Sequence, residues 1–128
     1  MFKDTKAFSS FSVDNLEKAE QFYVELLQLG ISVHKEMGLF QLHTNGGNDI
    51  VVYEKPNHVP ATFTILNFPV QDVETSVKEL KNLGITFENY DMPDLKTDAD
   101  NISRDNGGPT VAWFKDPAGN ILSLMESK

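Results

Sequence analysis

The sequence has no cysteine in its 128 residues. This absence excludes disulfide bonds, thiolate zinc sites, iron–sulfur clusters and a cysteine nucleophile. Basic residues are also few, with 11 Lys and Arg against 19 Asp and Glu, and the formal net charge is -8 at pH 7. Because a protein needs a basic face to bind a polyphosphate, we expect no nucleic-acid partner.

Long hydrophobic runs are missing as well. No stretch approaches the roughly 20 apolar residues that cross a bilayer. The opening sequence MFKDTKAFSSFSVDN also lacks the apolar core of a secretory signal. We therefore expect a cytoplasmic protein without a membrane partner. Its length indicates a single domain, residues 1–128.

Two segments of the chain resemble each other. FSVDNLEKAEQFYVELLQLGI covers residues 11–31 and FPVQDVETSVKELKNLGI covers residues 68–85. Each begins as a short apolar strand and ends on Leu-Gly-Ile, with apolar residues at three- and four-residue intervals between. This spacing predicts one amphipathic helix in each segment.

Capping residues agree with both predicted helices. Asp14 or Asn15 can cap the first helix and Asp72 the second, because short polar side chains accept hydrogen bonds from first-turn N–H groups. Gly30 and Gly84 stand where a left-handed residue would end each helix.

Strand-like runs follow each helix, and the sequences NGGN and DPAGN supply hairpin turns between them. The predicted order is βαβββ twice, with module one at about 5–56 and module two at about 61–127. The predicted strands after the helices are 31–37, 39–43, 50–54, 85–90, 110–116 and 121–126.

Residues 91–109 break this symmetry, because they have no apolar period and form a longer connection than most. We expect a lid or a flexible excursion in which Leu95 and Ile102 are the available anchors. Arg104, the only arginine, is interpreted as a solvated charge paired with acidic neighbours, and an anion clamp is the alternative.

The motifs VDNLEKAEQFY, VQDVETSVKEL and AWFKDPAGNILSL, taken in this order, resemble the vicinal oxygen chelate superfamily. That superfamily contains glyoxalases, extradiol dioxygenases, fosfomycin-resistance enzymes and bleomycin-resistance binding proteins. The resemblance implies an α+β fold of two βαβββ modules, which form a curved, open half-barrel sheet with helices outside and a ligand cavity inside. It also implies a homodimer, since members usually assemble by pairing modules.

In the superfamily's enzymes, His or Glu side chains on inner strand positions hold a divalent metal. Those positions fall here on Phe8, Ile65, Ser123 and either Val51 or Val52. Hydrocarbon side chains have no lone pair to donate, and one hydroxyl cannot hold Zn, Ni, Mn or Fe. We therefore predict no metal, no other cofactor and no catalytic residue.

A displaced metal site would need other ligands. His34 with Glu36, and His43 with Glu54, are the pairs considered, together with His58. A solvated or hydrogen-bonded histidine on a strand is the favoured interpretation of each.

If Phe8 and Ile65 occupy the inner positions that the resemblance implies, strand alternation predicts which other residues line the cavity. The last hairpin would set Trp113 opposite Ser123 and send Phe114 and Leu122 to the core. Aromatic and small polar groups together suit a small-molecule site, although such side chains can also simply fill the space. The predicted ligand-binding residues are Phe8, Ser10, Asn67, Trp113, Ser123, His43 and Tyr53.

The leading hypothesis is a metal-independent protein that binds a small planar or partly apolar molecule without performing chemistry on it. One alternative is a metal-dependent lyase or dioxygenase of the same superfamily with displaced ligands such as His43 and Glu54. The other alternative is a structural or interaction subunit that has no ligand.

Overall fold

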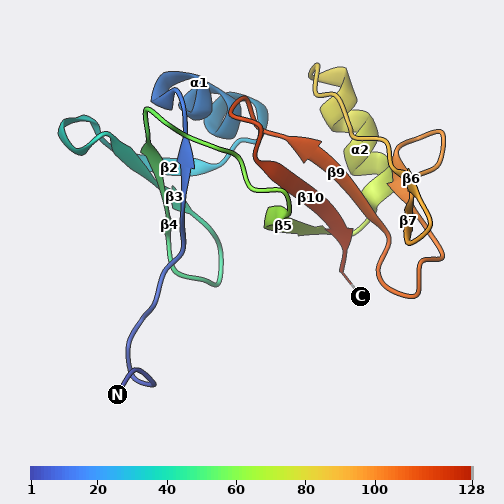
Figure 1. Cartoon of the computed structure of the whole chain (residues 1–128), viewed down its shortest axis with the longest axis horizontal. Coiled ribbons are helices and arrows are strands. Elements are labelled where there is room, and N and C mark those ends of the chain that lie inside the picture. The colour runs from blue at the N-terminus through green and yellow to red at the C-terminus, as the bar shows by residue number, and fades with distance from the viewer. Residues whose placement is uncertain (128) are drawn as a thin grey trace. The chain divides into compact units, whose positions relative to one another are not determined.

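The structure is a computed structural model, and it describes residues 1–127. The chain divides into two compact units, of which the first is Met1–Pro60 and the second begins at Ala61. Each unit has its own four-stranded sheet and its own helix (Figure 1). Within the described chain, no helix is long and apolar enough to span a membrane.

The first unit has the predicted βαβββ order. Its sheet has the strand order β1-β4-β3-β2, in which β1 and β4 are parallel and the other pairs antiparallel. A short 3-10 turn, Lys35–Met37, separates β2 from β3. The elements are β1 (Ser10–Val13), α1 (Leu16–Glu20) with a π-helical continuation (Gln21–Leu26), β2 (Gly30–His34), β3 (Leu39–His43) and β4 (Ile50–Glu54).

The second unit repeats this topology. Its sheet has the order β5-β10-β9-β8, and β5 is parallel to β10. A two-stranded hairpin, β6–β7, lies outside the sheet. The elements are β5 (Thr64–Val70), α2 (Val73–Asn82), β6 (Asp91–Met92), β7 (Leu95–Lys96), β8 (Ile102–Ser103), β9 (Val111–Lys115) and β10 (Ile121–Glu126).

The fourth strand of the second sheet differs from the prediction. In the predicted strand 85–90, Phe87 makes an isolated bridge to Phe114, and β8 supplies the fourth strand instead. The excursion 91–109 therefore contains strands, and Ile102 in β8 is buried. Two-residue strands leave no periodic pattern in a sequence, which is why the prediction missed them.

Three of the four predicted helix boundaries are correct. The side chains of Asn15 and Asp72 accept hydrogen bonds from first-turn backbone N–H groups, and Gly84 has a positive φ of 92°. The prediction for Gly30 is wrong, because this residue lies in β2 and Gln28 takes the left-handed conformation, with φ 57°.

The π-helical continuation of α1 explains this displacement. The backbone N–H of Leu27 donates to the carbonyl of Phe22, five residues earlier, and that of Leu29 donates to Tyr23. The wide turn moves the end of the helix relative to the regular pattern that the sequence suggested.

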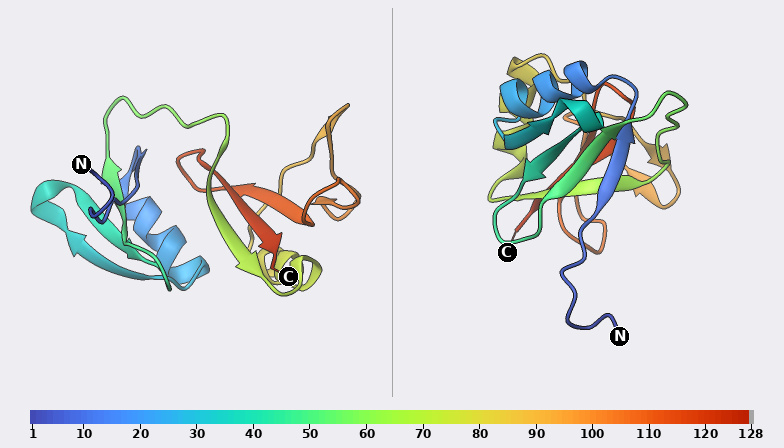
Figure 2. Two further views of the ribbon diagram at one scale, coloured as in Figure 1. Left: turned by 90° about the horizontal axis from the view of Figure 1, so that it is seen from below. Right: turned by 90° about the vertical axis from the view of Figure 1, so that its left-hand side faces the viewer.

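Each helix covers one face of its own sheet (Figure 2). In each unit the core lies between the helix and the sheet. In the first unit, Tyr23 is fully buried and its ring lies 6.3 Å from that of Phe40 on β3. In the second unit, Phe114 and Leu122 are fully buried, as predicted, and the Phe114 ring lies 5.3 Å from that of Phe87.

Candidate functional site

The hairpin between β9 and β10 has the predicted register, and it places Trp113 opposite Ser123. The buried carboxylate of Asp116 fixes the turn by accepting hydrogen bonds from the backbone N–H groups of Ala118 (3.0 Å) and Asn120 (2.9 Å). The DPAGN sequence thus folds as an Asx-type turn, which sets the register of both strands.

Ser123 and Asn67, both predicted site residues, lie side by side. They are register partners on β10 and β5, and the Ser123 hydroxyl donates to Asn67 Oδ1 at 2.6 Å. Ser123 is 0% exposed, whereas Asn67 is exposed. A molecule bound to this face would therefore contact Asn67 rather than Ser123. The hydrogen bond from Ser123 fixes the position of the Asn67 side chain.

Trp113 is partly exposed and is held from two sides. Its indole Nε1–H donates to Thr64 Oγ1 at 3.1 Å, and the ring of Tyr90 packs edge-on against it at 5.4 Å. Burial, with help from the nearby Glu88 carboxylate, raises the pKa of Tyr90.

Sequence reasoning missed Thr64 and Tyr90. Thr64 is three residues from Asn67, so simple alternation assigns the two residues to opposite faces. The pairing of β5 with β10 contains a β-bulge between Ile121 and Leu122, which leaves Ile65 without a register partner on β10. This extra residue on β5 places Thr64 on the same face of the sheet as Asn67. No local pattern in the sequence marks that bulge.

The first unit carries the other predicted residues. The register places Ser10, His43 and Tyr53 on the face of the first sheet that is turned away from the helix, as predicted. Phe8 lies two residues before β1 and is 65% exposed, so it is outside the strand, but it shares a hollow with Gln41 and Val51 on the face turned away from the helix. It lines a hollow of about 210 Å³ together with Lys6, Gln41, Asn48, Asp49 and Val51.

His43 contacts two side chains that the sequence did not single out. Its Nε2 lies 2.8 Å from the Ser32 hydroxyl, and its Nδ1 lies 3.0 Å from Asp49 Oδ1. Ser32 is on β2 and Asp49 directly precedes β4, so only the register of the sheet brings them to His43.

The displaced metal pairs are not supported. Glu54 faces the helix side of the sheet, where its Oε2 accepts a hydrogen bond from the Leu16 backbone at 2.8 Å, so it does not meet His43. His34 contacts the side chain of Gln41 at 3.2 Å, and Glu36 lies in the 3-10 turn rather than on the same strand face.

The positions at which the superfamily's enzymes bind a metal do not fit one here. Phe8 and Ile65 offer hydrocarbon, and the hydroxyl of Ser123 already donates to Asn67. Over residues 1–127, no group of three or more His, Asp or Glu side chains is placed to hold a metal ion.

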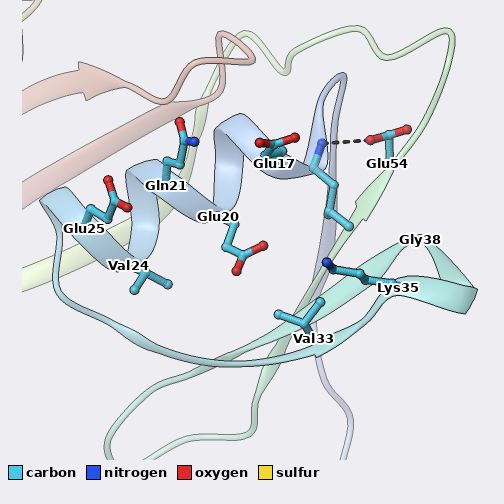
Figure 3. A pocket seen from close by; sticks show the side chains of 10 residues that line it. Glu17, Glu20, Gln21, Val24, Glu25, Val33, Lys35, Gly38 and Glu54 are labelled. Carbon is cyan, nitrogen blue, oxygen red and sulfur yellow. Dashed lines mark hydrogen bonds between the residues drawn. The ribbon is translucent and has the colours of Figure 1, made fainter.

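A hollow of about 640 Å³ lies on the helix side of the first unit (Figure 3). Four of its lining residues are glutamates, Glu17, Glu20, Glu25 and Glu54, and Lys35 is the basic one. Glu54 serves here as a cap for the start of α1. The acidic lining disfavours anionic molecules, and the predicted site residues lie elsewhere.

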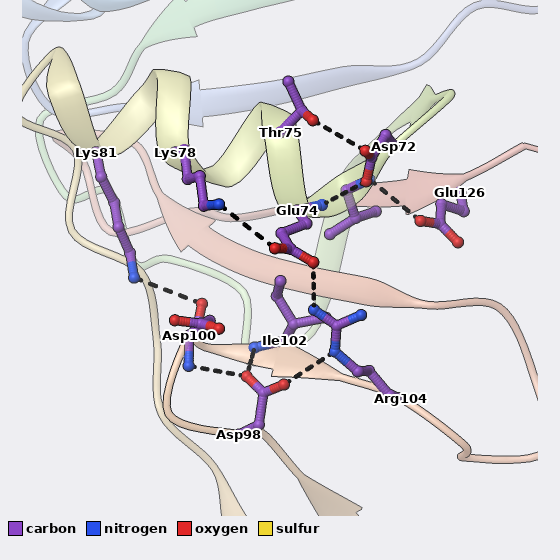
Figure 4. A network of polar contacts seen from close by, with 11 residues as sticks. Asp72, Glu74, Thr75, Lys78, Lys81, Asp98, Asp100, Ile102, Arg104 and Glu126 are labelled. Carbon is purple, nitrogen blue, oxygen red and sulfur yellow. Dashed lines mark hydrogen bonds and ion pairs between the residues drawn. The ribbon is translucent and has the colours of Figure 1, made fainter.

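The excursion 91–109 is tied to α2 by a polar network (Figure 4). Arg104 contacts Asp98 at 3.0 Å and Glu74 on α2 at 3.2 Å, so its interpretation as a paired charge is confirmed. Burial raises the pKa of Asp98, but hydrogen bonds from the Ile102 backbone and from Arg104 outweigh this and lower it below the usual 3.8.

Comparison with solved structures defines the class of fold. The chain has the fold of the glyoxalase/bleomycin-resistance/dioxygenase superfamily, which confirms the predicted fold class of two βαβββ modules. A member of that superfamily from Sphaerobacter thermophilus aligns with 99% of this chain and 100% of its own, at 20% identity and a TM-score of 0.73.

Two further structures show how widely the fold is used. TnmS3, an antibiotic-binding protein from Streptomyces sp. CB03234, is 21% identical over 100% of this chain and 99% of its own, with a TM-score of 0.69. A lactoylglutathione lyase from Agrobacterium tumefaciens is 18% identical over 99% and 96%, with a TM-score of 0.69. No family model and no curated protein matches the chain. The fold is therefore shared with both binding proteins and enzymes.

Proposed function

We propose that this chain is a metal-independent protein that binds a small planar or partly apolar molecule, as the bleomycin-resistance type of superfamily member does. The observation that carries this proposal is the partly exposed indole of Trp113, which Thr64 and Tyr90 hold in one orientation. Asn67, two strands away on the same face, supplies an exposed amide.

This arrangement favours a planar guest for a physical reason. An indole face that is already oriented loses little conformational freedom when a ring stacks on it, so most of the stacking energy is kept. Stacking contributes roughly 0.5 to 1.5 kcal/mol beyond the burial of area. The amide of Asn67 can orient the guest by one hydrogen bond, and its own position is set by Ser123.

Metal independence is supported by the side chains at the superfamily's metal positions, which offer no set of imidazole and carboxylate ligands. A metal-dependent lyase or dioxygenase is the alternative. It is tested by elemental mass spectrometry of protein purified without a tag or chelator. Near-stoichiometric Zn, Ni, Mn or Fe would overturn metal independence.

Trp113 also provides the test of binding, because it is the only tryptophan and its emission reports on this spot. A panel of aromatic and conjugated compounds is titrated into the protein, and each hit is confirmed by calorimetry. We expect bound ligand to quench or shift the emission. Trp113→Ala should weaken binding about tenfold, which is 1.4 kcal/mol, whereas Trp113→Phe keeps an aromatic face and should lose less.

A confirmed ligand that binds Trp113→Ala as tightly as wild type, and leaves the wild-type emission unchanged, would place the site elsewhere. If a broad screen finds no ligand at all, the alternative of a structural or interaction subunit is favoured.

We also propose that the protein is a cytoplasmic homodimer without a nucleic-acid partner. Its sheets have edge strands that association can cover, and closed two-fold dimers are the commonest assembly of soluble chains. Light scattering over a wide concentration range tests this, and a constant monomer mass would contradict it.

A further inference from the structure

We propose that Ser32, His43 and Asp49 form a nucleophilic site that hydrolyses short-chain esters. The Ser32 hydroxyl lies 2.8 Å from His43 Nε2, and His43 Nδ1 lies 3.0 Å from Asp49 Oδ1. This activity goes beyond ligand binding at Trp113, and its failure would leave the binding proposal unaffected.

The sheet register builds this chain of contacts. Residue Gly30 on β2 is directly opposite His43 on β3, and Ser32 is two residues further along β2 on the same face. A β-carbon at Gly30 would lie 3.7 Å from the His43 ring, an ordinary contact distance, so Gly30 lies directly beside the imidazole. Asp49 directly precedes β4 and reaches the ring from the other side.

The two ring nitrogens have different partners, and the difference sets their roles. A carboxylate at Nδ1 favours the tautomer that carries its proton there, which leaves the lone pair of Nε2 directed at the serine hydroxyl. Both contacts fall within the roughly 2.6 to 3.2 Å over which a base can act on a nucleophile. His34 differs, because its Nε2 contacts the amide oxygen of Gln41.

The site is open to small substrates. The His43 and Asp49 side chains are 43% and 40% exposed. Asp49 and Gln41, which is the register partner of Ser32, also line the hollow of about 210 Å³ beside Phe8. That volume is below the roughly 300 to 1,000 Å³ of sites for larger ligands, so the structure favours a short acyl group.

The reaction uses only an ester and water. His43 Nε2 removes the hydroxyl proton while Ser32 Oγ bonds to the ester carbonyl carbon, and the resulting tetrahedral species expels the alcohol, which takes that proton from His43. Water then gives a proton to His43 and attacks the acyl-serine. The carboxylic acid leaves and Ser32 recovers its proton. Asp49 is a positioning residue, because it acts through His43.

The first experiment uses an ethyl fluorophosphonate probe, which phosphonylates an activated serine and releases fluoride. Intact-mass and peptide mass spectrometry should find one adduct, on Ser32, and Ser32→Ala and His43→Ala should each abolish it. Asp49→Asn should slow labelling at least tenfold, and Asp49→Glu, which keeps the carboxylate, should recover part of the rate. Circular dichroism melting curves establish that each variant is folded.

Ser12→Ala is the matched control, because Ser12 is on the same sheet and its hydroxyl lies 2.6 Å from His58 Nδ1. This variant should label at the wild-type rate. The second experiment compares hydrolysis of p-nitrophenyl acetate and p-nitrophenyl octanoate, and the acetate should be turned over at least tenfold faster through an acetyl adduct on Ser32.

Absence of an adduct on Ser32 in folded wild-type protein would overturn the proposal, as would an adduct on Ser12 or full labelling of His43→Ala. Acetate hydrolysis that survives in Ser32→Ala would show simple surface-imidazole chemistry and would also overturn it.

Discussion

Asn101 provides a test of how the 91–109 excursion is held in place. Substituting its side chain should destabilise the second unit, by an amount that depends on the residue that replaces it. Its side chain is largely buried. The amide nitrogen lies 2.8 Å from Asn89 Oδ1 and within 3.4 Å of the carbonyls of Phe87 and Glu88, and its Oδ1 accepts from Lys81 Nζ at 2.8 Å.

The magnitude follows from these contacts and from the backbone. Two amide hydrogens can make two good bonds, worth about 1 kcal/mol each, and the charge-assisted bond from a lysine at the surface adds about 1 kcal/mol. Asn101→Ala should therefore lower the free energy of unfolding by about 3 kcal/mol. Asn101 also has φ 69°, a conformation that strains alanine. Asn101→Gly should be about 0.5 to 1 kcal/mol more stable than Asn101→Ala, after allowing for glycine's greater unfolded entropy.

Urea unfolding, followed by Trp113 emission and by circular dichroism, measures both differences. Asn101→Asp is the control that separates the contacts, because it keeps the acceptor for Lys81 and loses the amide donors. Two results would refute the reasoning. One is that both the alanine and glycine variants unfold within about 0.5 kcal/mol of wild type, and the other is that alanine is the more stable replacement.

Two further predictions concern the same unit. Because the pKa of Asp98 is lowered in the folded state, its contribution to stability is present above the usual 3.8 and is lost as pH falls through the lowered value. Arg104→Gln removes one cause of this lowered pKa, so the free energy of unfolding should fall less steeply as the pH drops below about 4. An unfolding free energy that depends on pH in the same way as in wild type would contradict this. Phe114→Ala, which removes a fully buried ring packed on Phe87, should cost about 3 to 5 kcal/mol in thermal or urea unfolding, and a cost below about 1 kcal/mol would contradict the assigned core.

The parts of the fold that follow local rules were predictable from the sequence. Caps such as Asn15 and Asp72 depend on a side chain and a backbone N–H a few residues away, and the turn at Asp116 depends on its own carboxylate. These contacts are set within five residues of sequence. The register of Trp113 opposite Ser123 followed from the same turn.

The parts that depend on distant pairing were not predictable. The bulge at Ile65 exists because β5 pairs with β10, more than fifty residues away, and it alone brings Thr64 to Trp113. Strand alternation put His43 on the correct face of its sheet. It did not reveal Ser32 or Asp49 as its neighbours, because their proximity depends on which strand lies beside β3 and on the turn that precedes β4.

The strand order of the two sheets has a consequence for synthesis on the ribosome. In each unit the strand made last, β4 or β10, lies between the first strand and the rest of the sheet. A nascent chain emerges from its N-terminus, so the first unit can close once β4 has left the exit tunnel. The second unit must wait for β10, and until then the apolar residues Leu66 and Phe68 of β5 have no strand to pair with. Slow translation between residues 70 and 121 would therefore prolong the stage at which the chain is most exposed to aggregation and to chaperones.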